Sequence, residues 1–571
     1  MMFTYERLFF MKESIMKNFK NVISYSLNSL KGHRIKCLGL LILLLFSNVV
    51  NLGFSVINQI TVDEVIYNRN IHFLLDKMIY IILIMLFAIV LVSIVNKYLF
   101  LNIAANSLKK LRMDFFANIL NSDYLYIIEK SGSDIYYRMF SDLNIIHQFS
   151  INVIMSMPIQ IVSTVLILLI MFNWSAVLSI AYLILMFINI IGIHLSKKHV
   201  KKIYKIQRVA EQSIISNIQE DFNNCDNIKC YGIENIRINL MKNKMNSFTT
   251  IDVKNSFVLS LITIVNNLTL LFWSVISIAI GAYLIYQNNL SIGQFVAFQT
   301  LSNMVSPTLK GVLELVYAYP TIKVSYERIL EYCKQTNNTF IENKACTYSK
   351  KLELTINSYM YPKSQNFIIK NFKFECYPGE AIGIVGGNGT GKTTVLNIIS
   401  RLITNGDFNV QIDSINIKLI SWVNYKANVT YLYQDIKLFN DSIINNITLN
   451  RQNIDKDFMM YLIKTMHFDN FINSLPNGLD TNLNGDVLCL SLGNKQKLGI
   501  IRTFLTKPKI VLLDEPTSNL DMVAKEGLIE LIDYYKKEFN AIVIIATHDK
   551  QIMRSLDKLN YISERIGFNE K

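Results

Sequence analysis

Six long apolar stretches constrain the fold of this chain more than any other feature of its sequence. A helix needs about 20 apolar residues to cross the hydrocarbon core of a membrane, because that core holds no water to satisfy backbone polar groups. The sequence therefore predicts a polytopic α-helical membrane domain with six transmembrane helices. The stretches run approximately over residues 37–57, 78–101, 151–172, 176–195, 256–283 and 292–317.

Basic residues predict how these helices are oriented. The chain has 57 Lys and Arg residues against 43 Asp and Glu residues, a net charge of +14. The long polar connections 102–150 and 196–255 alternate with short ones, and the second begins with lysines such as Lys197 and Lys205. Positively charged loops stay in the cytoplasm. These loops, the N-terminus and the C-terminal part are therefore expected there, in a multi-pass protein of the cell membrane.

The same distribution of charge bears on partners. The basic residues flank the apolar stretches and do not form a patch interleaved with aromatic residues, so the lipid bilayer is the expected partner and nucleic acid is not. Lys310 and Glu314 lie four residues apart in the sixth stretch. They either line a substrate pathway or mark a helix that has already left the membrane.

The N-terminal tail and the cysteines carry weaker signals. Residues 1–36 are predicted to form a cytoplasmic tail, in which Phe19, Ile23 and Leu30 recur at helical spacing beside lysines. This pattern is typical of a helix lying at the membrane interface, and an unremarkable basic tail is the alternative. The seven cysteines are scattered along the chain and are predicted to be reduced thiols.

A second domain is predicted at residues 351–571, after a linker at 331–350. Short apolar runs alternate there with helical segments, which indicates a cytosolic α/β fold with a mostly parallel sheet. One run, 381–385, leads into the pattern GxxxxGKT and then an apolar helix, as in a P-loop NTPase. In this pattern backbone N–H groups converge on phosphates, Lys392 reaches the terminal phosphates and Thr393 ligates magnesium, so ATP and Mg²⁺ are the expected ligands. The loop consists of Gly386, Gly387, Asn388, Gly389, Thr390, Gly391, Lys392, Thr393 and Thr394.

Two further apolar runs end in groups suited to phosphate chemistry. The run 510–513 ends in Asp514 and Glu515, and the run 541–546 is followed by His548. The carboxyl ends of parallel strands meet at one edge of a sheet, beside the phosphate loop. Asp514 is expected to hold Mg²⁺, Glu515 to polarise the attacking water, and His548 to reach the γ-phosphate. Ordinary strand-end residues are the alternative for each of them taken alone.

Over nearly its whole length the sequence resembles an ATP-binding cassette (ABC) half-transporter of the exporter type. The resemblance implies a six-helix transmembrane domain at 37–330 fused to a nucleotide-binding domain at 351–571. It also implies that Tyr361 stacks on adenine, that Gln434 links the γ-phosphate and Mg²⁺ to the membrane domain, and that Asp521 lies in a loop that crosses to a partner. The segments that look like the family's coupling loops are 111–120, 133–144 and 218–236.

The signature segment departs from the family pattern. It normally reads LSGGQ and binds the ATP held by the opposite subunit, and here it reads LSLGN, with Ser491, Gly493 and Asn494 as the candidate contacts. Leu492 adds bulk at a glycine position. The altered positions of this degenerate signature are typical of a heterodimer, in which a partner subunit brings an intact signature. The retained Ser491 and Gly493 are compatible with a homodimer, and the two alternatives stay open equally. The preceding loop also differs, at Gly485 and Val487.

The resemblance implies an ATP hydrolase that drives transport by alternating access. The expected cargo is a peptide, a lipid or an amphiphilic small molecule, moved out of the cytoplasm. Two alternatives remain: a membrane sensor or regulator for peptide resistance that uses the same ATP cycle, and an importer on the exporter scaffold. The composition, rich in isoleucine, lysine and asparagine, indicates a bacterial source.

Overall fold

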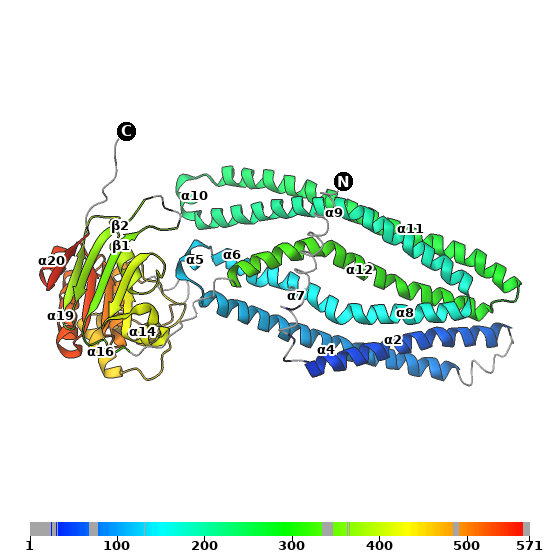
Figure 1. The fold of residues 1–571 in the computed structure, drawn as a ribbon, viewed down its shortest axis with the longest axis horizontal. Helices are drawn as coiled ribbons and strands as arrows, with labels where there is room; N and C mark the ends of the chain where they lie inside the picture. The colour runs from blue at the N-terminus through cyan, green and yellow to red at the C-terminus, as the bar shows by residue number, and fades with distance from the viewer. Residues whose placement is uncertain are drawn as a thin grey trace. The chain divides into compact units, whose positions relative to one another are not determined.

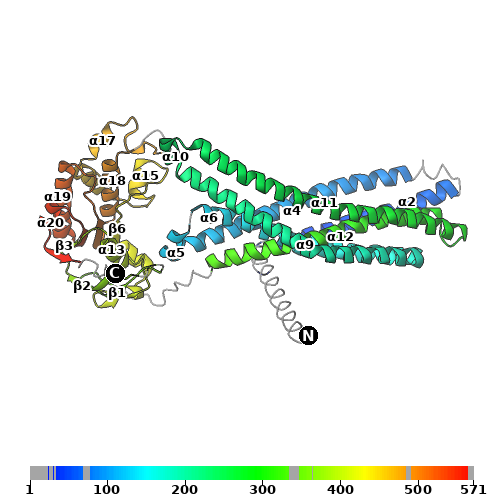
Figure 2. The same cartoon turned by 90° about the horizontal axis from the view of Figure 1, so that it is seen from above.

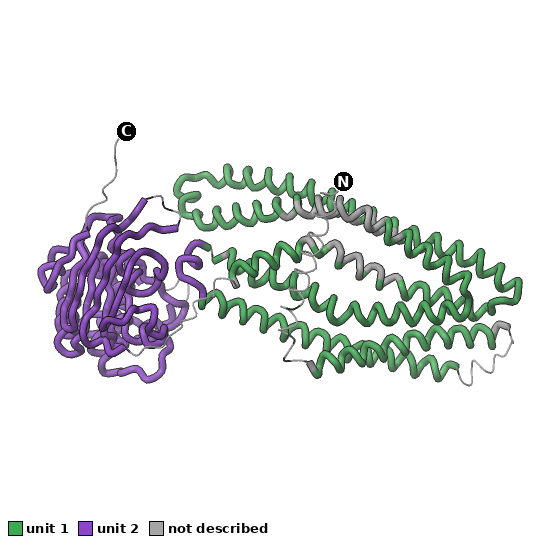
Figure 3. Tube along the Cα trace, viewed as in Figure 1, with its two compact units in different colours: residues 1–121, 130–334 green, residues 122–129, 335–571 purple. Residues whose placement is uncertain are grey.

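The computed structural model describes residues 24, 30, 32, 34–67, 78–130, 132–333, 346–362, 364, 366–483 and 490–562, with some side chains left out within the long helices. The chain divides into two compact units, residues 1–121 with 130–334, and residues 122–129 with 335–571 (Figure 3). Most of the expected tail helix, the changed positions Gly485 and Val487, and the side chains of Lys310 and Glu314 lie outside the described part.

The first unit is built from long helices, in agreement with the predicted membrane domain (Figure 1). Among the described residues, four stretches are long and apolar enough to cross a membrane, namely 35–65, 79–120, 134–174 and 267–286, and a shorter apolar helix covers 176–188. That the chain has six transmembrane helices remains a prediction. The main helices are α2 (Arg34–Val62), α4 (Ile79–Leu120), α8 (Met157–Trp174), α9 (Ala176–Asn223), α11 (Glu234–Tyr286) and α12 (Ile292–Cys333).

Several of these helices continue far beyond the apolar stretches that they contain. Helices α9 and α11 lie side by side along their length (Figures 1 and 2) and are joined by the short helix α10 (Cys225–Tyr231). Gly232 ends α10 in the left-handed conformation, with φ of 63°, where a side chain would be strained. The long polar connection 196–255 is thus mostly helical. A second set of short helices follows α4: α5 (Tyr124–Glu129), α6 (Gly132–Tyr137), the π-helix η4 (Arg138–Asp142), α7 (Leu143–Ile151) and the π-helix η5 (Asn152–Ser156).

Buried polar side chains tie α12 to its neighbours. The Tyr182 hydroxyl of α9 donates to the Ser302 carbonyl (2.8 Å), and the Trp273 indole of α11 donates to the Ser302 hydroxyl (2.9 Å). Because all three are buried, these bonds avoid the cost of unpaired polar groups in an apolar environment. Two aromatic anchors from different helices therefore fix one position of α12.

A second polar link joins η4 to α12. Asp142 is fully buried, accepts a bond from the Arg138 guanidinium (2.9 Å) and accepts another from the Ser325 hydroxyl of α12 (2.7 Å). Breaking a buried ion pair by removing one partner leaves an uncompensated charge. The geometry therefore holds the η4 turn against α12.

The second unit is a single domain that contains two sheets. A five-stranded parallel sheet has the order β6-β7-β8-β3-β9 and confirms the predicted parallel sheet. A four-stranded antiparallel sheet, order β2-β1-β4-β5, was not predicted. The strands are β1 (Leu352–Tyr359), β2 (Ile369–Cys376), β3 (Ala381–Val385), β4 (Asp407–Ile412), β5 (Ile415–Asn416), β6 (Val429–Leu432), β7 (Ile510–Asp514), β8 (Ile542–Ala546) and β9 (Lys558–Tyr561).

Helices cover both faces of the parallel sheet, so its central strands β7, β8 and β3 are buried on both sides. On β7, Val511 and Leu513 belong to one apolar core, and Ile510 and Leu512 belong to the other. Such strands read as continuous apolar runs, which is why they were recognisable in the sequence. The helices are α13 (Lys392–Ile399), α14 (Trp422–Asn428), α15 (Ile443–Thr448), α16 (Lys456–Thr465), α17 (Asp469–Asn473), α18 (Leu492–Leu505), α19 (Met522–Phe539) and α20 (Lys550–Arg554).

Candidate functional site

Three neighbouring strands of the parallel sheet end at one edge and bring the predicted catalytic groups together. Strand β8 lies between β7 and β3, with Leu513 opposite Ile545 and Ile384 opposite Ala546. The three strands are parallel, so the segments that follow them emerge at the same edge of the sheet. The phosphate loop, the Asp514–Glu515 pair and His548 therefore converge.

Glycine is required in the loop between β3 and α13. Gly389 and Gly391 have φ of 77° and 106°, a region that residues with side chains rarely adopt. A Cβ on Gly391 would also lie 2.8 Å from a side-chain atom of Ile369. The loop can therefore wrap closely, with the N-terminus of α13 directly behind it.

Lys392 folds back over this loop. Its ammonium group donates to the carbonyls of Gly386 (2.9 Å) and Gly387 (3.0 Å), and the side chain is almost fully buried. The positive charge is thus held above the loop, beside the N-terminus of α13, where both the charge and the helix favour an anion.

Thr393 and Asp514 are in direct contact. The Thr393 hydroxyl donates to Asp514 Oδ2 (2.7 Å), and the hydroxyl of Tyr431 on β6 approaches the same oxygen at 3.3 Å. Burial raises the pKa of Asp514, and the nearby Glu515 carboxylate raises it further, whereas the two hydroxyl donors lower it. An oxygen-rich corner results, in which a buried carboxylate lacks a full counter-charge.

Glu515 is held in a strained backbone conformation between two polar side chains. Its φ is +45°, and its N–H donates to the Ala546 carbonyl (2.8 Å). The Gln434 amide donates to one carboxylate oxygen (3.3 Å), and His548 Nδ1 lies 3.3 Å from the other. Gln434 and His548, which were both predicted to act at the γ-phosphate, therefore both contact Glu515.

These groups surround a single cavity of about 510 Å³. This size falls within the range of small-molecule sites. The phosphate loop, Glu515 and His548 all contribute to its lining. It is lined by Ile368, Asn388, Gly389, Gly391, Lys392, Thr393, Thr394, Gln434, Glu515 and His548.

Tyr361, predicted to stack on adenine, lies at the margin of this site. Its hydroxyl is 3.3 Å from the Thr394 hydroxyl, and its ring packs edge-on against Tyr359 at 5.3 Å. The ring is partly exposed and next to the loop. Ile368, which lines the cavity, was not predicted, because a single isoleucine before a strand carries no recognisable signal.

The signature residues do not line the cavity of their own chain. The Ser491 hydroxyl accepts from the Asn494 N–H (3.2 Å) and caps the start of α18. Gly493 packs against the loop before α19, where a Cβ would lie 2.9 Å from the Asn519 carbonyl oxygen. Asp521 caps α19 through the Ala524 N–H (2.8 Å). Two capped helix N-termini thus lie next to each other, away from the lined cavity.

A tyrosine pair connects the site to α5. The rings of Tyr431 and Tyr433 lie 4.2 Å apart, and Tyr433 hydrogen-bonds to Tyr124 of α5, in the same compact unit. Burial raises the pKa of both Tyr431 and Tyr433. These tyrosines were not predicted as part of the site, although Tyr431 and Tyr433 lie just before Gln434 in the sequence.

Comparisons with known proteins agree with this architecture. The family model for the ABC transporter transmembrane region matches residues 37–309, and the ABC transporter model matches residues 369–518. A putative export ATP-binding/permease protein of Rickettsia typhi is 27% identical over 485 residues, which are 82% of this chain and 81% of that protein. A multidrug resistance-like ATP-binding protein of Buchnera aphidicola is 29% identical over 404 residues, which cover 68% of this chain and 67% of that protein.

A solved structure supports the fold. The structure of a bacterial Atm1-family ABC exporter with ATP bound has a TM-score of 0.83, at 17% sequence identity, and the match covers 93% of both chains. The two family models together span most of the present chain and meet in one polypeptide with this fold. The chain therefore belongs to the ABC transporters, as an exporter-type half-transporter whose ATPase domain is coupled to transport.

Proposed function

We propose that this chain is one half of an ATP-driven exporter that moves its cargo out of the cytoplasm by alternating access. The observation that carries the proposal is the convergence of Lys392, Thr393, Asp514, Glu515 and His548 on one cavity, in a chain that also contains an apolar helical unit. The name of the relative in Rickettsia typhi, a putative export ATP-binding/permease protein, supports the outward direction. In this proposal the nucleotide-binding domain and the N-terminus are cytoplasmic.

Each residue of the site has a distinct role in binding ATP. The backbone N–H groups of the loop 386–394 receive the phosphates, and Lys392 exchanges its two carbonyl partners for phosphate oxygens. Tyr361, beside Thr394, is placed to stack on the base. These contacts hold the terminal phosphate in front of Glu515.

The polar corner of the site fits a magnesium ion. Mg²⁺ prefers oxygen ligands and is usually held by one or two protein groups together with waters and substrate phosphates. The Thr393 hydroxyl and the Asp514 carboxylate already meet at 2.7 Å, and the Gln434 amide can supply a further oxygen. A buried carboxylate with a raised pKa also gains from a nearby positive charge. When bound, the ion neutralises charge on the phosphates.

Glu515 acts as the general base in this mechanism. Its carboxylate accepts the proton of the attacking water, while Gln434 and His548, each at 3.3 Å, fix its two oxygens. His548 also approaches the γ-phosphate. The fixed conformation of Glu515 orients the carboxylate before the substrate enters, so no reorganisation is required during the reaction.

The working transporter contains two such chains or one chain with a related partner. Ser491, Gly493 and Asn494 lie outside the cavity of their own chain, which supports their contact with ATP held by a second subunit. Helix α10 buries none of its residues within this chain. The side chain of Leu492 is 65% exposed at the start of α18, where it hinders close approach of a phosphate and weakens the contribution of this chain to its partner's site.

Substitution of the base tests the mechanism. We expect Glu515→Gln to lower the rate of ATP hydrolysis about a hundredfold or more, because the amide cannot accept the proton. ATP binding should persist, because the phosphate contacts come from other residues. ATP turnover and binding of a fluorescent ATP analogue are measured on purified protein. Glu526→Gln, at an exposed glutamate of α19, is the matched control. Full turnover in Glu515→Gln would reject the assignment.

A further inference from the structure

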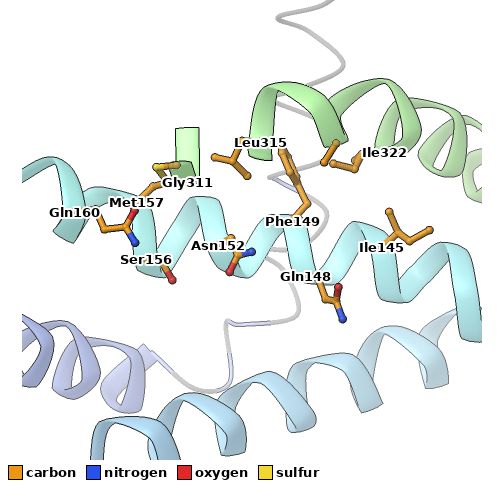
Figure 4. A pocket seen from close by; sticks show the side chains of 11 residues that line it. Ile145, Gln148, Phe149, Asn152, Ser156, Met157, Gln160, Gly311, Leu315 and Ile322 are labelled. Atoms are coloured by element: carbon orange, nitrogen blue, oxygen red, sulfur yellow. The ribbon is translucent and has the colours of Figure 1, made fainter. Parts of the chain in front are cut away.

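A cavity of about 350 Å³ lies within the helical unit, between the α7–η5–α8 segment and α12 (Figure 4). It is far from the nucleotide site in sequence and is lined only by residues of the helical unit. A volume of this size is within the range of small-molecule sites. One side of the cavity is apolar, with Ile145, Phe149, Met157, Leu315 and Ile322.

The other side carries four polar side chains at intervals of four residues. Gln148, Asn152, Ser156 and Gln160 follow one another along a single helical segment, as Figure 4 shows. None of the described residues that line the cavity is charged. Gln148 and Asn152 are exposed, whereas Ser156 and Gln160 are half-buried, so the polar row leads from an open end into the protein.

The π-helix η5 keeps this row aligned. Four residues exceed one turn of an α-helix, so a row with this spacing drifts around a regular helix. The wider turn of a π-helix takes more than four residues, and η5 (Asn152–Ser156) therefore offsets part of the drift. Pro158, which lacks an N–H group, follows directly and contributes to the irregular bonding. The π-helix η5 thus helps to keep the four polar side chains in one row along the cavity.

Two features at the inner end indicate a ligand. The Gln160 Oε1 atom is buried and has no hydrogen-bond partner among the described residues. An unpaired buried acceptor is costly unless a ligand or water supplies a donor. Gly311 of α12 faces this atom, and a Cβ there would lie 3.1 Å from Gln160 Oε1 and 3.3 Å from Met157 Cε. Glycine is unfavourable within a helix, and here it leaves space at the end of the polar row.

We propose that this cavity binds the backbone of an uncharged, extended peptide segment as the transported cargo. Four residues of a helix advance by about 6 Å. Two residues of an extended peptide advance by about 6.6 Å, and alternate residues present their N–H and C=O groups on the same edge. The Gln and Asn amides both donate and accept, so the row matches that edge, while the apolar side receives the side chains. This assignment rests on the proposed transport function.

Peptide binding to the full-length protein in lipid nanodiscs, without nucleotide, tests the assignment. The probe is radiolabelled acetyl-Leu-Ala-Leu-Ala-amide, measured by equilibrium dialysis against empty nanodiscs. We expect saturable binding. The depsipeptide analogue, in which esters replace the amides, keeps the shape but lacks the N–H donors, and it should bind about tenfold more weakly. Versions with Lys or Glu in place of one Ala should also bind more weakly, since a buried unpaired charge is costly.

Variants of the cavity locate the site. Gln160→Met keeps the side-chain length and removes the unpaired acceptor, so the protein should be at least as stable while peptide affinity falls about tenfold. Gly311→Ala should likewise favour the helix and weaken binding by filling the space next to Gln160. Gln287→Met, the same change at an exposed residue, is the control and should leave affinity unchanged. Thermal unfolding midpoints confirm that each variant is folded.

The outcomes separate this inference from the proposed function. The inference is overturned if the peptide and the depsipeptide bind equally, or if a charged version binds equally or more tightly. It is also overturned if peptide affinity is unchanged in Gln160→Met and Gly311→Ala. Displacement of the peptide by a membrane lipid, together with equal binding of the depsipeptide, assigns the cavity to lipid. ATP turnover is measured on the same samples. Turnover that depends on Glu515 without peptide binding leaves the ATPase mechanism intact, and peptide binding without turnover rejects only that mechanism.

Discussion

At the scale of single residues, the nucleotide site combines a strained backbone with a buried, partly compensated charge. The left-handed conformation of Glu515 costs about 1–3 kcal/mol and is held by the bond from its N–H group to the Ala546 carbonyl. Asp514 next to it is buried and has a raised pKa. Function has therefore been given priority over stability at these two adjacent positions.

Asp514→Asn should stabilise the protein and abolish magnesium-dependent turnover. The amide avoids the cost of a buried charge and can still accept from Thr393. We expect the unfolding midpoint of the nucleotide-binding domain to rise by about 2–4 °C, as about 1 kcal/mol gives in a domain of this size. Thermal unfolding and ATP hydrolysis are measured in parallel. A lower midpoint at neutral pH would contradict the role of burial.

The pH dependence of the stability gained in Asp514→Asn follows from the direction of the pKa shift of Asp514. Burial raises the pKa of Asp514 above its unfolded value, so the folded protein prefers the protonated form. The native protein therefore loses stability as the pH rises through the folded pKa. The difference in midpoint between Asp514→Asn and the native protein should be small in acid and grow towards neutral pH. A difference that is constant with pH would show that ionisation of Asp514 is not its cause.

At the scale of elements, the start of α12 is fixed by Asp63, the first residue of the π-helix η2 (Asp63–Tyr67), which directly follows α2. Asp63 accepts from the Gly293 N–H (2.8 Å) and from the Ser291 hydroxyl (2.8 Å), and Gly293 lies so close that a Cβ would clash with the Gln59 carbonyl. Ser291 and Gln294 also form a reciprocal capping box. The capping pattern was readable in the sequence, but the contribution of Asp63 was not.

Asp63→Ala should loosen this junction. Loss of a helix cap costs about 1–2 kcal/mol, so the unfolding midpoint of the purified full-length protein should fall. Asp63→Asn keeps an acceptor for the Gly293 N–H and should lose less than half as much. Thermal unfolding in one detergent compares the two variants. Equal loss in both would indicate that charge, and not hydrogen bonding, holds the junction.

Helix α5 and strand β6 form a second junction, through the series Tyr124, Tyr433, Tyr431 and Asp514. Tyr431→Phe removes only the hydroxyl that contacts Asp514. We expect ATP turnover to fall about tenfold, because hydrogen bonds to charged groups are worth more than neutral ones, and the Mg²⁺ concentration for half-maximal rate to rise.

The control for this change is Tyr534→Phe, at a tyrosine of α19 that packs against Phe539 in the same domain. Both variants keep the ring, so packing is unchanged. Steady-state hydrolysis is measured over a series of Mg²⁺ concentrations. Identical curves for Tyr431→Phe and the native protein would show that the hydroxyl does not position Asp514.

At the scale of the whole molecule, one chain leaves surfaces uncovered that a second subunit can cover. Tyr231 on α10 is 78% exposed and Phe222 near the end of α9 is 77% exposed. The signature residues at α18 also do not line the cavity of their own chain. Two separate regions of the chain are thus incomplete alone.

Leu492→Gly should raise the ATP turnover of the purified chain if two copies associate. The substitution allows backbone N–H donors to approach the phosphate closely again. A single such donor changes the rate of catalysis by about a hundredfold in favourable cases. We therefore expect ATP turnover to increase by about tenfold. Met522→Gly, at the exposed first residue of α19, controls for glycine at a helix start. Turnover is compared at equal protein concentration. No increase would contradict the view that Leu492 limits the contact.

The sequence by itself determined the classes of element and predicted the chemistry of the nucleotide site. Apolar runs long enough for a membrane, and short runs ending in GxxxxGKT or in Asp514 and Glu515, are local patterns that depend on few distant contacts. The antiparallel sheet escaped prediction, because its strands bury only alternate residues and its pairing joins segments that are far apart.

Only the tertiary structure decided which side chains meet. The contact of Tyr431 with Asp514 depends on β6 lying next to β7, and that of Asp63 with α12 depends on how α2 packs. The polar row from Gln148 to Gln160 gains its meaning from the π-helix and from Gly311 on the opposite helix. Local hydrogen bonding and periodicity set the elements, whereas strand order and helix packing bring distant residues together, and those are not encoded in any short stretch of sequence.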